Sequence, residues 1–301
     1  MNAVGGYRCG TVAIAGRPNV GKSTLLNALL GQKLSIVTPK AQTTRHRILG
    51  VLSRPEFQLL LLDTPGLHAG RGRRLNQAMN REAMAAITGA DAALLVADAT
   101  RWTDEDEAVL ARLVAAGLPV VLVLNKVDRV RPRGRLLPLL QELGTRHSFA
   151  AIVPISALHG DNLERLLTAV AALLPESQPL FPLDQVTDRS ERFLAGEILR
   201  EQLTLQLHEE LPYGIAVEIE RYEDLPDGRL AIDAVIWVER ESQRSIVIGA
   251  GGQRLKSVGR AARLELNRVL ERRVHLSTWV RVREGWTDDD RLLGQLGYES
   301  R

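Results

Sequence analysis

The first 175 residues alternate short apolar runs with stretches in which apolar residues recur at helical spacing. The apolar runs predict buried strands at residues 11–15, 59–62, 93–97, 120–124 and 152–155. The helical stretches cover residues 23–30, 75–88, 105–116, 135–143 and 163–173. This alternation is typical of an α/β domain, a mostly parallel sheet covered by helices on both faces. Residues 47–52 and 57–62 are separated by a short turn, which predicts an antiparallel hairpin at the sheet edge.

A change of pattern follows at residues 175–182, where three prolines fall within eight residues. Proline disfavours helix at its own position and at the preceding one, so this stretch predicts an extended linker. Beyond it the order is a helix, two strands, two helices and a last strand. Their predicted ranges are 190–208, 215–222, 230–238, the two flanks of 249–252, and 274–282. We therefore expect a first domain at 1–174, a linker at 175–187, and an α+β second domain with a C-terminal tail at 188–301.

The composition is that of a globular protein, with 45% hydrophobic and 25% charged residues in 301. Cys9 is the single cysteine, which excludes an intramolecular disulfide and a cysteine-cluster metal site. The first ten residues lack the pattern of an export signal, and no run of about 18 uncharged apolar residues occurs. These features predict a cytoplasmic location.

The charge is unevenly distributed, although the net value is only +3. Residues 1–181 hold 21 basic and 14 acidic residues, whereas residues 182–301 hold 18 and 22. Inside that acidic half, residues 244–283 hold 10 basic and 2 acidic residues. A basic block inside an acidic domain indicates a local site for a polyanion.

A phosphate-binding motif lies between the first predicted strand and helix. The segment Gly16-Arg-Pro-Asn-Val-Gly-Lys-Ser23 fits G-x-x-x-x-G-K-S/T in the strand–loop–helix context that this motif requires. Its glycines let backbone N–H groups surround phosphate, Lys22 supplies a full charge, and the Ser23 hydroxyl is suited to Mg²⁺. The predicted contacts are Gly16, Arg17, Pro18, Asn19, Val20, Gly21, Lys22, Ser23 and Thr24.

The segment Asn125-Lys-Val-Asp128 identifies the base. It follows a predicted strand, at the edge where open α/β sheets bind ligands. The Asp128 carboxylate can accept from N1–H and the N2 amino group of guanine, whereas adenine would leave it unpaired. Asn125 is predicted to contact the purine edge or to hold the loop, and Lys126 to cover the ring.

Three further segments complete a nucleotide site. Asp63-Thr64-Pro65-Gly66 ends a strand, so Asp63 is placed to hold Mg²⁺ and the Gly66 N–H to reach a γ-phosphate. A hydroxyl from Thr43 or Thr44 is suited to complete the Mg²⁺ ligands. The segment Ser156-Ala157-Leu158 offers a backbone N–H to the guanine oxygen.

In this order and spacing, the five segments resemble the translation-factor-related GTPases and, in particular, the bacterial Era GTPase family. The resemblance covers nearly the whole chain, including Gln42–Arg47 (QTTRHR) and Asp63–His68 (DTPGLH). It implies that Thr44 joins Ser23 and Asp63 on Mg²⁺ and that Lys22, Thr44, Gly66 and Asn19 serve catalysis. Asn19 resembles the asparagine that supports K⁺ in related GTPases. Leu67 stands where Ras-like proteins have a water-orienting Gln, so slow intrinsic hydrolysis is expected.

The second domain contains the motif G-x-x-G at residues 249–252, between two predicted helices. In KH modules such a turn lets a nucleic-acid backbone approach closely, and the alternative is a helix C-cap. The element order matches the type II KH fold. The predicted RNA contacts are Ile248, Gly249, Ala250, Gly251, Gly252, Arg254, Lys256 and Arg260, with Arg244 and Arg263 flanking them. The family usually has Lys where this chain has Ala250, which predicts weaker affinity and a shallower salt dependence.

The resemblance also implies a cellular role. It predicts a GTP-dependent switch that hydrolyses GTP to GDP and binds single-stranded RNA, namely the 3′ end of 16S rRNA, during small-subunit (30S) assembly and rRNA maturation. It further implies a monomer with peripheral contact to the cytoplasmic face of the cell membrane.

Three other classes of protein share parts of this pattern. A P-loop nucleotide kinase would share residues 16–23 but would not need residues 125–128, and it would need a pocket for a phosphate acceptor. Release of phosphate without a phosphorylated acceptor would exclude this class. A structural RNA-binding module would need only the second domain. Loss of function in Lys22→Ala with RNA binding intact would argue against this class. A membrane-remodelling GTPase would be stimulated by lipid rather than by RNA.

A few residues outside the motifs carry weaker expectations. Arg45, Arg47, Arg71, Arg73 and Arg74 lie near the predicted switch segments and are expected on a solvated face, with RNA or the other domain as alternative contacts. Cys9, Trp237 and Trp279 are expected in the core.

Overall fold

The computed structural model describes residues 6–40, 43–65, 74–207 and 214–296, which form two compact units. Unit 1 holds residues 6–35, 44–65 and 79–188. Unit 2 holds residues 189–207 and 214–296, together with residues 36–40, 43 and 74–78. The domain boundaries at 174 and 188 stay predictions. Within the described ranges, no helix is long and apolar enough to cross a membrane.

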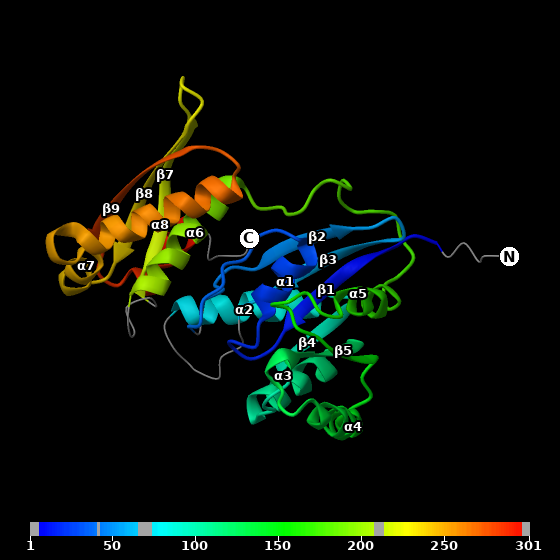
Figure 1. Cartoon of the computed structure of the whole chain (residues 1–301). Coiled ribbons are helices and arrows are strands. Elements are labelled where there is room, and N and C mark those ends of the chain that lie inside the picture. Colours follow the sequence, from blue (N-terminus) through cyan, green and yellow to red (C-terminus); the bar gives the residue numbers. More distant parts are fainter. Residues whose placement is uncertain (1–5, 41–42, 66–73, 208–213, 297–301) are drawn as a thin grey trace. The chain divides into compact units, whose positions relative to one another are not determined.

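Unit 1 is built on a six-stranded sheet in the order β2-β3-β1-β4-β5-β6 (Figure 1). Only β2 runs antiparallel, against β3, and the other pairs are parallel. The mostly parallel sheet and its antiparallel edge hairpin are confirmed. The strands are β1 (Arg8–Ala15), β2 (Ile48–Ser53), β3 (Phe57–Asp63), β4 (Ala92–Asp98), β5 (Val120–Asn125) and β6 (Ala151–Pro154).

Helices pack on this sheet because its central strands are apolar on both faces. Leu95 and Leu122 from the strands form one buried cluster with Val109 and Leu113 of α3 and Leu143 of α4. The predicted helices differ from the observed ones by one to three residues at their ends. They are α1 (Lys22–Leu30), α2 (Arg74–Thr88), α3 (Asp104–Ala115), α4 (Leu136–Arg146) and α5 (Leu163–Ala171), with short 3-10 helices at Val127–Arg129 and Arg133–Arg135.

The proline-rich stretch 175–187 is extended and hydrogen-bonded to the strands of unit 1. The N–H of Val51 donates to the carbonyl of Val186 at 2.7 Å, and Oγ1 of Thr187 donates to the carbonyl of Leu49 at 2.7 Å. The fully buried side chain of Gln58 accepts from the N–H of Leu180 at 2.8 Å. The stretch is therefore anchored to unit 1 along its length.

Unit 2 has the predicted order α-β-β-α-α-β. Its three strands lie in the order β7-β8-β9, with β7 antiparallel and β9 parallel to β8. The elements are α6 (Glu191–Gln206), β7 (Ala216–Asp224), β8 (Leu230–Val238), α7 (Glu241–Ile248), the 3-10 turn Ala250–Gly252, α8 (Gln253–Val269), β9 (Val274–Val282), the 3-10 turn Trp286–Asp288 and α9 (Asp290–Gln295).

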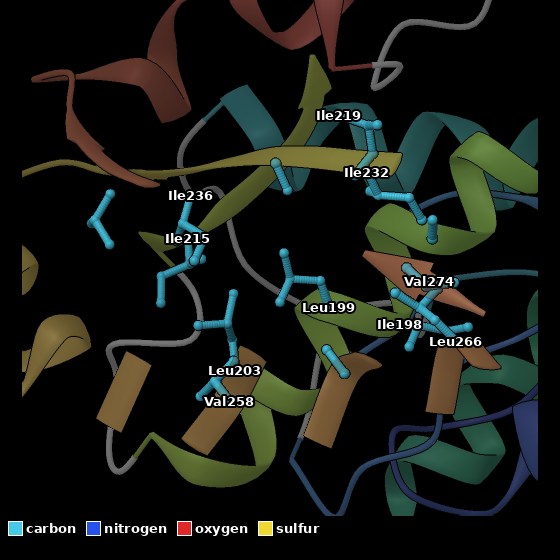
Figure 2. Close-up of a cluster of buried hydrophobic side chains, with 14 of the residues drawn as sticks. Ile198, Leu199, Leu203, Ile215, Ile219, Ile232, Ile236, Val258, Leu266 and Val274 are labelled. Atoms are coloured by element: carbon cyan, nitrogen blue, oxygen red, sulfur yellow. The ribbon is translucent and has the colours of Figure 1, made fainter. Parts of the chain in front are cut away.

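The core of unit 2 fills the space between one face of the sheet and its helices (Figure 2). Leu199 and Leu203 of α6 meet Ile232 and Ile236 of β8 and Leu266 of α8 there. Burying each such side chain contributes roughly 1.5–3 kcal/mol. The helices cover one face of the sheet, which determines which strand residues are buried.

The expected core position of Trp279 is wrong. Its side chain lies on β9 and is 46% exposed, whereas its neighbour Val280 is buried. Successive side chains of a strand point to opposite faces, so the two residues cannot share the helix-covered face. Trp237 is half-buried and donates from Nε1 to Glu218, and Cys9 is buried as expected.

Candidate nucleotide and RNA sites

The phosphate loop connects β1 to α1 through backbone conformations that glycine alone adopts easily. Gly16 has φ 153° and Gly21 has φ 101°. A Cβ on Gly16 would lie 2.4 Å from the carbonyl oxygen of Val96, and one on Gly21 would lie 2.4 Å from Nδ2 of Asn125. At these two positions the loop passes too close to β4 and β5 for a side chain, and glycines in such conformations let backbone N–H groups face an anion.

Lys22 is buried within this loop. Its Nζ donates to the carbonyl oxygens of Gly16 at 2.8 Å and Arg17 at 2.9 Å. Burial lowers the pKa of Lys22 to about 8, because the ammonium loses its hydration, although the carboxylate of Asp63 opposes that shift. An arriving phosphate group would supply the counter-charge that this ammonium lacks.

A second buried carboxylate anchors the loop from outside the motifs. Oδ2 of Asp106 accepts from Nε of Arg17 at 3.1 Å and from the N–H and hydroxyl of Thr103 at 3.0 and 2.9 Å. Asp106 is fully buried and lies in the first turn of α3, where it forms a capping box with Thr103. The sequence offered only the capping pattern as a signal, so its contact with Arg17 was missed.

The three predicted metal ligands meet beside the phosphate loop. Oγ of Ser23 lies 2.7 Å from Oδ2 of Asp63 and 2.8 Å from Oγ1 of Thr44. Asp63 is fully buried, burial raises its pKa, and its Oδ1 has no hydrogen-bond partner. An unpartnered buried carboxylate oxygen beside two hydroxyls is a set of hard oxygen donors that fits Mg²⁺.

Asn125 holds loops together in this structure. Its Nδ2 donates to the carbonyl of Val20 at 2.9 Å, and its Oδ1 accepts from the N–H groups of Lys126 and Ala157 at 2.8 and 2.9 Å. Of the two roles left open by the sequence, the geometry favours the structural one. Asn125 joins the phosphate loop to both segments that are predicted to contact the base.

The residues predicted to recognise the base lie at the ends of β5 and β6. Lys126 has φ 65°, and its Nζ donates to the carbonyl of Asn19 at 2.6 Å. Oδ1 of Asp128 accepts from the Ser156 hydroxyl at 2.7 Å, and this hydrogen bond lowers the pKa of Asp128. Asp128 is therefore held as the carboxylate that guanine recognition requires, while Leu158 stands 69% exposed nearby.

For four other predicted residues, the structure gives no placement, a buried one, or one that differs from the expectation. Gly66 and Leu67 lie outside the described residues, so their roles stay predictions. Thr64 is buried and donates to the carbonyl of Ile14 at 3.1 Å. Arg45 is 2% exposed, so the expectation of a solvated position is wrong for this residue.

The G-x-x-G turn of unit 2 also depends on glycine. Gly249, Gly251 and Gly252 have φ values of 74°, 56° and 75°. A Cβ on Gly249 would lie 2.7 Å from Cβ of Arg254, whose guanidinium donates to the carbonyl of Ile246 at 2.7 Å. The turn is thus a tight connection between α7 and α8, with an open outer side.

A cavity of about 490 Å³ lies beside this turn, between α8 and β9. It joins three cations to an apolar surface formed by two leucines. Its lining is Gly252, Leu255, Lys256, Gly259, Arg260, Arg263, Leu276 and Thr278. Such a combination suits an unstacked base and its phosphates. The sequence predicted the turn and the basic helix, but it missed the contribution of β9.

The fold and the sites define a P-loop GTPase followed by a KH domain. The GTPase family described as "50S ribosome-binding GTPase" matches residues 11–126, and the KH domain family matches residues 210–287. The predicted fold class is confirmed.

Comparison with individual proteins identifies the family to which the whole chain belongs. GTPase Era of Stenotrophomonas maltophilia (strain R551-3) is 55% identical over 294 residues, covering 97% of this chain and 98% of that protein. GTPase Era of Xanthomonas campestris pv. campestris (strain B100) is 52% identical over 300 residues, covering 99% and 100%. The chain belongs to the Era GTPase family, and the predicted GTPase activity is confirmed.

Two solved structures of Era are similar to this chain over nearly its full length. Era in complex with MgGDPNP and nucleotides 1506–1542 of 16S ribosomal RNA is 42% identical with a TM-score of 0.93, covering 98% of this chain and 100% of that one. An Aquifex aeolicus Era variant bound to GDP and AlF4⁻ is 41% identical with a TM-score of 0.93, covering 97% and 100%.

Proposed function

We propose that this GTPase binds Mg²⁺·GTP in unit 1 and the single-stranded 3′ end of 16S rRNA in the cavity of unit 2, and that it acts in small ribosomal subunit assembly and rRNA maturation. The observation that carries this proposal is the whole-length likeness to Era bound to MgGDPNP and 16S rRNA. The cavity with its three cations supports it independently.

The residues of unit 1 divide the work of binding and hydrolysis. Loop amides and Lys22 bind the β and γ phosphates, and Asp128 selects guanine. Mg²⁺, when bound, neutralises developing phosphate charge, and Ser23, Thr44 and Asp63 are the residues that would hold it. The Gly66 N–H is proposed to contact the γ-phosphate. Since Leu67 cannot hydrogen-bond a water, intrinsic hydrolysis is slow.

In unit 2 the residues that line the cavity are assigned to two parts of the RNA, its phosphates and a base. Lys256, Arg260 and Arg263 are proposed to contact phosphates, and Leu255 and Leu276 to provide the apolar surface for a base. The tight turn at residues 249–252 has no side chain at three of its four positions, which lets the RNA backbone approach closely.

The test combines nucleotide and RNA measurements on the full chain. We expect GTP but not ATP to be hydrolysed, and labelled RNA from the 3′ end of 16S rRNA to bind more tightly than a scrambled RNA. Lys256→Glu with Arg260→Glu should weaken RNA binding by two orders of magnitude or more and leave GTP affinity unchanged. The matched control is Arg229→Glu on the β7–β8 hairpin, outside the cavity. Equal binding by the double variant would overturn the RNA assignment.

Potassium is proposed as a further ion at the phosphate loop. The support is the resemblance of Asn19 to the asparagine of cation-dependent GTPases and its left-handed backbone, with φ 62°. Turnover in potassium should exceed turnover in sodium, and Asn19→Ala should remove the difference. Equal turnover of the wild type in both salts would reject the ion.

We also propose a cytoplasmic monomer that makes peripheral contact with the cytoplasmic face of the membrane. The support is family resemblance together with the single buried cysteine. Sedimentation equilibrium measures the oligomeric state. Co-sedimentation with vesicles containing phosphatidylglycerol measures the membrane contact, and recovery of the protein only in the supernatant would reject it.

A further inference from the structure

A serine outside every predicted motif is bonded to the proposed metal-binding aspartate. Ser35 is fully buried, and its hydroxyl donates to Oδ2 of Asp63 at 2.8 Å. Ser23 donates to the same oxygen at 2.7 Å. The two hydroxyls occupy both lone pairs of Oδ2, while Oδ1 is buried without a partner. The two oxygens of one carboxylate are therefore in different environments.

Ser35 is itself held in place by helix α1. Oδ1 of Asn27 accepts from the N–H groups of Leu34 and Ser35, both at 2.9 Å. Nδ2 of Asn27 donates to the carbonyl of Ser35 at 2.7 Å. Asn27 lies four residues after Ser23, one turn further along the same helix. The two hydroxyls that hold Asp63 are thus fixed by one rigid element.

We propose that Ser35 is a positioning residue for the magnesium site. It fixes the rotation of the Asp63 carboxylate so that Oδ1 stays available to the metal or to a metal-bound water. The terminal torsion of aspartate is broad, so a single donor from Ser23 would leave the carboxylate free to turn. Groups that orient metal ligands in this way typically contribute 10- to 100-fold to metal affinity. The inference rests on the proposed Mg²⁺ at this site.

Ser35 is the last residue of unit 1 before residues 36–40, which group with unit 2. The hydroxyl of Ser35 therefore bonds the metal-binding aspartate at the point where the chain leaves unit 1.

The experiment measures the Mg²⁺ requirement for nucleotide retention. Release of a fluorescent GDP analogue is followed over a series of free Mg²⁺ concentrations buffered with EDTA. We expect Ser35→Ala to raise the Mg²⁺ midpoint about tenfold. Nucleotide affinity in EDTA alone should stay within twofold of the wild type. Ser53→Ala is the matched control, because the Ser53 hydroxyl accepts from Gln58 in the same unit.

Two more variants test whether the hydroxyl itself is responsible. Ser35→Thr keeps the hydroxyl and should recover most of the Mg²⁺ affinity, whereas the nearly isosteric Ser35→Cys, with a weak donor, should fall between wild type and Ser35→Ala. Asn27→Ala should raise the midpoint too, and less than additively when combined with Ser35→Ala. Thermal unfolding in EDTA verifies that each variant is folded.

The outcomes separate this inference from the function on which it rests. A wild type whose GDP release does not respond to Mg²⁺ would reject magnesium at the site. A responsive wild type whose midpoint is matched within twofold by Ser35→Ala would overturn the role of Ser35. Should Ser35→Ala not fold, an unshifted midpoint in folded Ser35→Cys would overturn it equally.

Discussion

Nζ of Lys126 lies 2.8 Å from Oδ2 of Asp98, within an ion pair that joins the ends of two strands. The same ammonium donates to the carbonyl of Asn19 in the phosphate loop at 2.6 Å. Asp98 is held in turn by Thr100, whose N–H and hydroxyl donate to Oδ1 at 3.0 and 2.6 Å. Asp98 therefore orients the lysine that connects the base-recognition segment to the phosphate loop.

Replacing Asp98 with Asn tests this connection. The variant keeps the shape and removes the charge, so Lys126 loses its ionic partner, and one charge-assisted hydrogen bond is worth roughly 1.5–3 kcal/mol. We expect GTP and GDP affinities to fall together by about tenfold, measured by equilibrium fluorescence titration. Asp91→Asn, which alters a carboxylate bonded to the N–H of Thr11, is the control. An unchanged affinity in Asp98→Asn would show that the ion pair between Asp98 and Lys126 does not contribute to nucleotide binding.

The depressed pKa of Lys22 predicts a pH-dependent nucleotide affinity. Because burial lowers that pKa to about 8, the free protein loses the ammonium charge as the pH rises through 8. A bound triphosphate retains the proton, so binding above pH 8 takes up a proton and weakens by up to about tenfold per pH unit. Isothermal titration in buffers of different ionisation enthalpy should detect this uptake at pH 9 and not at pH 7.

Two further measurements bear on Lys22. The variant Lys22→Arg remains charged and should show a flat affinity profile between pH 7 and 9.5, although at weaker binding. Without nucleotide, the free energy of unfolding should rise between pH 8 and 10.5. In that range Lys22 is protonated in the unfolded chain but not in the folded one, so raising the pH favours the folded state. A wild-type affinity that is constant across this range would contradict the prediction.

We expect the preference for guanine to depend on Asp128 and not on its partner Ser156. Asp128→Asn keeps one oxygen that can accept from N1–H but replaces the acceptor for the N2 amino group of guanine with an amide donor, which suits the carbonyl at C2 of xanthine. We expect GTP affinity to fall at least 100-fold and xanthosine triphosphate to bind more tightly than GTP. Competitive displacement of a fluorescent nucleotide measures both values. Ser156→Ala, which removes the hydrogen bond to Asp128, should weaken GTP without changing the preferred base.

The nucleotide site was predictable where its residues are contiguous in sequence. Strand ends and glycine-rich turns fix the backbone of 16–23 and 125–128 locally, so periodicity and spacing were sufficient. Ser35, Asp98 and Asp106 carry no such signal, because each is a single polar residue that approaches the site only after folding. These buried partners of motif residues could be found only in three dimensions.

The same limit explains the errors in unit 2. Position 279 lies an odd number of residues from both buried positions, 274 and 280, and only residues an even number apart share a strand face. The alternation is visible in the sequence, but which face the helices cover is a property of the folded domain. The contribution of Leu276 and Thr278 to the cavity likewise depends on β9 lying beside α8.

A buried ion pair in α6 should be the most sensitive polar feature of unit 2. Arg200 donates to Glu197 at 2.6 Å, with both side chains at most 6% exposed, and also donates to the carbonyl of Thr43 at 2.6 Å. Arg200→Met removes the arginine of this buried ion pair and should cost about 3–5 kcal/mol in the free energy of unfolding. The more exposed pair of Arg268 and Glu265 provides the control, and Arg268→Met should cost less than about 1 kcal/mol.

Chemical denaturation measures the free energy of unfolding of these variants. The most informative comparison is between Arg200→Met and the double variant Glu197→Gln, Arg200→Met. Glu197→Gln removes the buried negative charge that Arg200 neutralises in the wild type, so the double variant should be more stable than Arg200→Met alone. If Arg200→Met were no less stable than the wild type, the pair would contribute nothing to the stability of α6.

The RNA cavity makes a prediction about salt dependence. Each phosphate contact to single-stranded RNA contributes about 0.7 to the slope of log affinity against log salt concentration. Lys256→Ala should therefore reduce the slope by about that amount, whereas Ala250→Lys should increase it by a similar amount and tighten binding at low salt. Arg229→Ala on the hairpin should leave the slope unchanged. A reduced slope for Lys256→Ala beside an unaltered one for Ala250→Lys would place the phosphates along α8 and away from the glycine turn.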